Sequence, residues 1–183
     1  MNANVARQME WSTRMFQNVI WPRMSETCSG GRLVMVESVV DEGFTKELDM
    51  LAGIDAWQVF DRLHRMRGIA SRVQKRKFKT FTIRSQVRSG GPTEYHKRLE
   101  AIRYAKKGYL LPHLTVQGYV DCEGQFSHAG AVRTKDLYAY AEKYWDTLFE
   151  GNNGDGTKFR AVPWAALLAA KIDVRIITLG EQP

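Results

Sequence analysis

Apolar residues recur at every third or fourth position in several segments of the chain, a spacing that predicts amphipathic helices. In the first such segment, one helical face is formed by Val5, Met9, Phe16 and Val19. Pro22 is expected to limit this helix, because proline lacks the backbone N–H that a helix interior needs. Similar spacing predicts helices over residues 93–106, 134–148 and 163–171, and a short helix or turn over 41–50.

Short runs of β-branched and aromatic residues between turn signals predict the strands. They cover residues 33–36, 54–60, 68–74, 79–85, 114–120 and 174–178, with a hairpin returning toward Val132 and a short strand near Phe159. The links between 54–60, 68–74 and 79–85 are short, which favours an antiparallel meander. The sequence therefore predicts an α/β (α+β) fold: a mixed sheet with a central antiparallel meander flanked by helices, in a single domain over residues 1–183.

Composition is typical of a globular protein, since 44% of the 183 residues are hydrophobic and 26% are charged. Two cysteines, Cys28 and Cys122, provide no disulfide framework, which favours a reducing compartment. Four scattered histidines make a structural zinc site an unfavourable interpretation. No stretch approaches the roughly 20 apolar residues of a membrane span, so no membrane association is predicted and the cytoplasm is the expected location.

Positive charge is concentrated in one quarter of the chain. The net charge is +7, yet the segment 62–107 holds fifteen Lys and Arg residues against only Glu94 and Glu100. Like charges repel one another in a folded protein, and a bound polyanion offsets that repulsion. Nucleic acid is the commonest such partner, because phosphate contacts by Lys and Arg release condensed counterions.

The sequence thus predicts a DNA- or RNA-binding protein whose basic residues gather on one outer face. The candidate nucleic-acid contacts are Arg72, Lys75, Arg76, Lys77, Lys79, Arg84, Arg88, Lys97 and Arg98. Phe78 and Phe81 lie among the lysines and arginines of this segment, an arrangement typical of proteins that bind single-stranded nucleic acid. Phe81 also fits the core of a β-strand. Glu94 with Lys97 or Arg98 stands at helical spacing, which is the pattern of a surface ion pair.

One constellation carries possible chemistry: Gly53-Ile54-Asp55 opens a strand, a second strand follows over Gly68–Gln74, and a basic tract comes next. Together with the order helix, strand meander, helix, strand, this resembles the PD-(D/E)XK nuclease superfamily. The resemblance implies that Asp55 ligates Mg²⁺, with Asp49 beside it in the same segment and Glu37 or Glu10 as a further carboxylate. Nucleases of this kind bind a hard cation through oxygen ligands and activate water against a phosphodiester.

The second motif of that superfamily places an acid, or sometimes Gln, two residues before a Lys on one strand. No frame of the second strand provides both groups, and Gln74 with Arg76 comes closest. A guanidinium cannot accept a proton and is a poor replacement for an ammonium. The candidate catalytic residues are therefore Asp55, Gln74 and Arg76, in either a working Mg²⁺-dependent nuclease or a relative that only binds nucleic acid.

Two other interpretations stay open. An isolated aspartate such as Asp55 more commonly pairs with an arginine than ligates a metal. The compact, basic chain is also typical of small phage or mobile-element proteins, acting in the host cytoplasm. A phage-encoded module that docks its basic face on an acidic host protein is the alternative function, because charge complementarity accelerates such an association.

Overall fold

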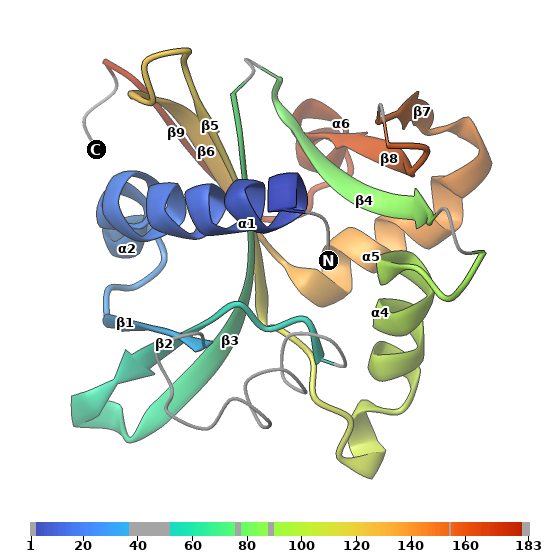
Figure 1. Ribbon diagram of the computed structural model, residues 1–183. Coiled ribbons are helices and arrows are strands. Elements are labelled where there is room, and N and C mark those ends of the chain that lie inside the picture. Colours follow the sequence, from blue (N-terminus) through green and yellow to red (C-terminus); the bar gives the residue numbers. More distant parts are fainter. Residues whose placement is uncertain (1–2, 37–51, 76–77, 88–89, 154, 181–183) are drawn as a thin grey trace.

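The computed structural model describes residues 3–36, 52–75, 78–87, 90–153 and 155–180 (Figure 1). A six-stranded sheet has the order β1 (Arg32–Met35), β2 (Ala56–Phe60), β3 (Arg65–Gln74), β5 (Leu114–Val120), β6 (Phe126–Arg133) and β9 (Val174–Thr178). A three-stranded sheet has the order β4 (Thr80–Gln86), β8 (Lys158–Pro163) and β7 (Phe149–Asn152). The helical segments are α1 (Ala3–Met15), η1 (Phe16–Ile20), α2 (Trp21–Thr27), η4 (Asp61–Leu63), α4 (Glu94–Arg103), η5 (Ala105–Lys107), α5 (Thr134–Tyr144), η6 (Trp145–Thr147) and α6 (Trp164–Ala169).

The six-stranded sheet is mixed and mostly antiparallel, which confirms the predicted fold class. Strands β1, β2 and β3 form an antiparallel meander, and β3 then pairs in parallel with β5. Strands β6 and β9 extend the sheet by antiparallel pairing. The connection from β3 to its parallel neighbour β5 passes through β4 and α4, because parallel strands need a long crossover.

The strand predicted over 79–85 forms as β4, but the meander predicted for it is wrong. It pairs with β8 in the second sheet, with Phe81 opposite Val162 and Ile83 opposite Arg160. Phe81 and Ile83 are buried there in a core cluster that also contains Trp164. The residues that pair with β4 lie about 80 positions further along the chain. The short link from β3 to β4 gives no indication of this pairing. The four-residue strand β7 was not predicted, and the predicted element over 41–50 lies outside the described residues.

The first helix continues past Pro22, in contrast to the prediction. Phe16–Ile20 is π-helical, and α2 begins directly after it with Pro22 in its first turn. A missing N–H is tolerated in a first turn, so the proline does not end the helical path.

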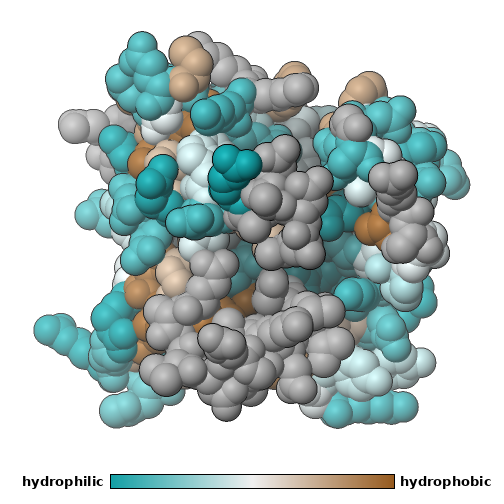
Figure 2. All heavy atoms as spheres, in the orientation of Figure 1, coloured by the Kyte–Doolittle hydropathy of each residue, from teal (hydrophilic) through white to brown (hydrophobic). Residues whose placement is uncertain are grey.

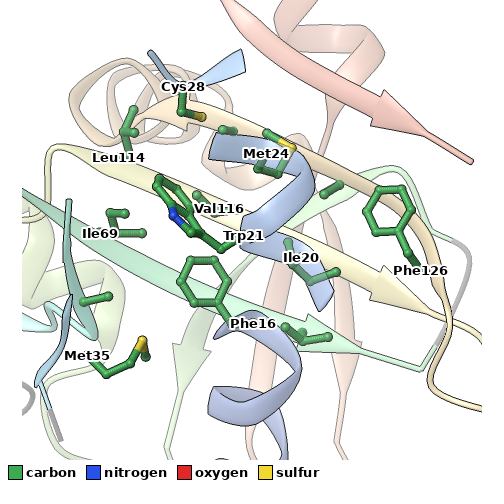
Figure 3. Close-up of a cluster of buried hydrophobic side chains, with 14 of the residues drawn as sticks. Phe16, Ile20, Trp21, Met24, Cys28, Met35, Ile69, Leu114, Val116 and Phe126 are labelled. Atoms are coloured by element: carbon green, nitrogen blue, oxygen red, sulfur yellow. The ribbon is translucent and has the colours of Figure 1, made fainter. Parts of the chain in front are cut away.

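This long helical path covers one face of the six-stranded sheet (Figure 1). Phe16, Ile20, Trp21 and Met24 point from it onto β3, β5 and β6, where they pack against Ile69, Val116 and Phe126 (Figure 3). The opposite face carries the second cluster, in which residues of β5 and β6 pack with α5, α6 and the second sheet. No helix in the described part of the chain is long and apolar enough to cross a membrane.

Close approach of η1 to the sheet depends on Gly118 of β5. A Cβ atom at this position would lie 2.5 Å from Cγ1 of Ile20. Gly118→Ala is therefore expected to reduce the free energy of unfolding by about 1–3 kcal/mol through overpacking. Urea denaturation measures the change, and the same substitution in an Ile20→Ala background should cost less, because the clashing atoms are gone. Equal costs in the two backgrounds would contradict the packing described here.

Candidate functional site

A cleft with a volume of about 1040 Å³ lies where α1, the two sheets and α4 meet. Its walls come from α1, β3, β4, α4 and the loop around Asp155, and its floor includes Gln117 of β5. Figure 2 shows hydrophilic residues inside a recess in this part of the molecule. Of the candidate nucleic-acid contacts, the cleft is lined by Arg72, Arg84, Lys97 and Arg98.

Arg72 of β3 connects the two sheets and α4 through its guanidinium. Nη1 donates to the backbone carbonyl and the hydroxyl of Thr82 on β4, each at 2.9 Å. Nη2 donates to Oε2 of Glu94 at 2.8 Å, in the first turn of α4. Thr82 in turn donates its hydroxyl to Oε1 of Gln117 at 3.1 Å. These bonds fix the relative positions of β3, β4, β5 and α4 around the cleft.

Glu94 is ionised in this arrangement. Burial raises the pKa of its carboxyl, but the Arg72 and Arg98 guanidiniums and a hydrogen bond from Tyr138 outweigh this effect, so the pKa lies below its ordinary value. Burial and the Glu94 charge raise the pKa of Tyr138 well above its usual range. The protonated Tyr138 hydroxyl therefore donates to Oε1 of Glu94 at 3.1 Å. The backbone N–H of Arg84 on β4 also donates to Oε2 of Glu94, at 3.4 Å. Glu94 is thereby bound to groups from β3, β4 and α5, in contrast to the surface pair predicted from its spacing.

Arg98 holds the chain where it enters β2. Its side chain is buried, and the guanidinium donates to the carbonyls of Ala52 and Gly53. Gly53 has a φ of +52°, and a Cβ atom there would lie 2.1 Å from Nη2 of Arg98. Glycine is thus required at this position, and Arg98 acts mainly by positioning the segment before Asp55.

Asp55 lies directly before β2 and is hydrogen-bonded to β3. Its backbone N–H donates to the carbonyl of Ile69 at 2.9 Å, and its carbonyl accepts from Val36 at 3.0 Å. Its carboxylate oxygen Oδ2 accepts hydrogen bonds from the backbone N–H of Ser71 at 2.5 Å and from the Ser71 hydroxyl at 3.3 Å. The carboxylate replaces the missing backbone acceptor of β2, and it lines the cleft.

The structure brings together part of the predicted catalytic set. Asp55 and Gln74 both line the cleft, but Gln74 lies three residues beyond Ser71, about 10 Å further along β3. Among the described residues, no three His, Cys, Asp or Glu side chains form a group that could hold a metal ion. Arg76, Lys77, Arg88 and the predicted metal ligands Glu37 and Asp49 lie outside the described residues.

The described basic residues of 62–107 do not all share one outer face, because Arg98 is buried. Arg62 and Arg65 lie at the β2–β3 hairpin, and Lys106 and Lys107 lie in η5 beyond α4. None of these four lines the cleft. Lys79 is exposed at the start of β4, and the Lys75 ammonium lies 5.2 Å from the Trp11 ring centre. Only part of the charge excess is therefore available to one ligand in the cleft.

Sequence reasoning missed Thr82 and Gln117 as parts of the site. Both are polar side chains inside strands, and each is at most 9% exposed. A glutamine in the middle of an otherwise apolar strand such as 114–120 is the signal that could have revealed the floor of the cleft.

Comparison of the chain with known proteins gives no match to a protein-family model, to a curated protein or to a solved structure.

Loss of the Glu94 charge should reduce stability in a pH-dependent way. Glu94→Gln is expected to lower the free energy of unfolding by about 2 kcal/mol near neutral pH, because Arg72 loses a charge-assisted partner. The folded pKa of Glu94 is depressed, so its contribution is present above the ordinary pKa of about 4.3 and is lost as the pH falls through the lower folded value. The difference between variant and wild type should therefore shrink in acid.

Urea denaturation over a pH series measures this difference. Glu100→Gln serves as the control, because Glu100 is an exposed residue of the same helix. A Glu94→Gln deficit that stays constant down to acid pH, or one that the control reproduces, would contradict the ion pair's role.

Proposed function

We propose that the protein binds nucleic acid, with the backbone phosphates held in the cleft. One observation carries this proposal: the fold brings Arg72, Arg84, Lys97 and Arg98 from three elements into a single cleft. A concentration of positive charge in the sequence does not by itself require these side chains to line one cleft.

The four cations differ in their exposure to solvent: Arg98 is buried, Arg72 is partly buried, and the other two are exposed. Arg72 is paired with Glu94, and Arg98 is bound to backbone carbonyls. Arg84 and Lys97 are exposed on the walls, one on β4 and one on α4. Arg72 already balances the charge of Glu94, so Glu94 does not cancel the charges of Arg84 and Lys97. These two exposed cations are therefore the main contributors to phosphate attraction at the entrance.

The dimensions of the cleft favour a short single-stranded segment over the side of a duplex. Its volume of about 1040 Å³ is close to the upper end of pockets that enclose small ligands, roughly 300–1000 Å³. A strand with unstacked bases fits such a space, and cations can hold its phosphates there.

Cleavage of the bound strand is a second candidate activity, and the placement of Asp55 favours it. Asp55 lines the same cleft, and α1, the β1–β3 meander, α4 and β5 follow one another as in the element order that suggested a PD-(D/E)XK nuclease, with β4 of the second sheet inserted between β3 and α4. The described residues alone do not fit a complete Mg²⁺ site, since Asp55 is joined by no group of acids. Binding is therefore the primary proposal, and no catalytic step through a metal is derived.

Removing the two exposed cations should weaken binding and reduce its dependence on salt. For the double variant Arg84→Gln/Lys97→Gln, the magnitude of the slope of log K against log salt is expected to fall by about 1.4, because two phosphate contacts to a single strand are lost. Fluorescence anisotropy with a labelled single-stranded DNA or RNA, titrated at several salt concentrations, measures both quantities.

The matched control is Lys106→Gln/Lys107→Gln, which removes the same charge away from the cleft. Equal weakening by both double variants would assign the attraction to overall charge and overturn the cleft as the binding site. Purified protein that binds no DNA or RNA, but captures one specific host protein, would favour a protein-docking function.

If the cleft cleaves its ligand, Asp55→Asn should abolish Mg²⁺-dependent cutting and leave binding within about twofold of wild type. The asparagine oxygen can still accept from Ser71, so the fold is preserved. Asp155→Asn is the control, because Asp155 is another carboxylate on the cleft wall. Gel analysis of labelled DNA and RNA measures cutting. Wild-type protein that cuts neither substrate with any divalent metal would remove cleavage from the proposal and leave binding intact.

A further inference from the structure

The floor of the cleft contains a buried hydrogen-bond donor with no partner among the described residues. Gln117 in the middle of β5 is 2% exposed and lines the cleft. Its Oε1 accepts hydrogen bonds from the backbone N–H and the hydroxyl of Thr82, at 3.4 and 3.1 Å. Its Nε2 has no hydrogen-bond partner in the described part of the structure.

The orientation of the Gln117 amide follows from the surrounding bonds. A backbone N–H can only donate, so the Gln117 atom that faces Thr82 N must be the oxygen. The Thr82 hydroxyl accepts from Arg72 and gives its own proton to the same oxygen. Flipping the amide would place two donors, Gln117 Nε2 and the Thr82 backbone N–H, opposite each other, so the NH₂ group is directed away from that N–H.

Arg72 lies directly beside Gln117 on the neighbouring strand. The two residues are register partners in the parallel β3–β5 pair, where strands are about 4.8 Å apart. Three hydrogen bonds engage Nη1 and Nη2 of Arg72, and 31% of its side chain is exposed. An amide donor and a guanidinium thus stand side by side, and both line the cleft.

We propose that Gln117 Nε2 and Arg72 form a subsite that holds one phosphate group of the nucleic acid at the floor of the cleft. This inference rests on the proposed function, and it gives Gln117 and Arg72 a role distinct from that of the exposed cations Arg84 and Lys97. A buried donor without a partner costs free energy, and a phosphate oxygen offsets that cost. The bond is charge-assisted, because the phosphate oxygen that accepts it is ionised.

Recognition of a base is less compatible with this geometry. A glutamine reads adenine through its oxygen and its nitrogen together. Here the oxygen is engaged by Thr82, which leaves only the donor. A donor next to a fixed positive charge is suited to an anionic oxygen.

Gln117→Glu tests the subsite, because it keeps the acceptor for Thr82 and replaces the donor with an oxygen. Affinity for a short single-stranded oligonucleotide is expected to fall by about tenfold or more, as for loss of a hydrogen bond to a charged group. Gln117→Met, which removes the donor without adding a charge, should give a similar loss. Gln74→Glu makes the same chemical change elsewhere on the cleft wall and should have a smaller effect.

Inorganic phosphate serves as a second probe, and it needs no variant. In wild-type protein, the side-chain amide signal of Gln117 in a ¹H–¹⁵N NMR spectrum should shift on titration with phosphate but not with an uncharged nucleoside. This measurement decides the question even if the substitutions at position 117 impair folding.

The outcomes separate the subsite from the proposed function. Wild-type binding with unchanged affinity in folded Gln117→Glu and Gln117→Met overturns the subsite and leaves nucleic-acid binding intact. A Gln117 signal that responds to nucleoside and not to phosphate overturns it in favour of base recognition. Absence of oligonucleotide binding by wild type overturns the proposed function, and a phosphate response would then identify the floor as a site for small anions.

Discussion

Arg72 and the groups that it binds are the constraint on which the site depends. Its guanidinium donates hydrogen bonds to Thr82 on β4 and Glu94 on α4, and the Thr82 hydroxyl donates in turn to Gln117 on β5. Tyr138 on α5 completes the contacts of Glu94. The hydrophobic effect between sheets is non-directional, whereas hydrogen bonds with partly buried charges require specific distances and angles. This network therefore sets the separation of the walls of the cleft.

The two faces of the six-stranded sheet explain why a polar network lies here. On one face, Ile69, Val73 and Val116 pack beneath α1, η1 and α2 in an apolar core. Arg72 and Gln117 alternate with these residues along β3 and β5, so they point to the other face. On that face the second sheet packs over the strands (Figure 1). The cleft is lined by β4 and α4 together with residues of α1.

Elements defined by local pattern were predicted well, and those that depend on distant partners were not. The strands 114–120 and 174–178 agree with β5 and β9 at both ends, because turn residues bound their apolar runs. The pairing of β4 was wrong because its apolar face packs on residues far along the chain, and proximity in sequence favoured β3 instead. Asp55 was correctly placed at the start of a strand, yet the Ser71 amide that binds its carboxylate depends on strand register.

The amino-acid sequence by itself determined the fold class, the excess of positive charge and its concentration in residues 62–107. Charge is a property of each side chain and needs no partner to be counted. Only the tertiary structure decided how that charge is used: Arg98 positions a loop, Arg72 joins two sheets, and Arg84 and Lys97 face the cleft. The physical reason is that a buried or paired cation is defined by the acceptors around it, and those acceptors come from segments distant in the chain.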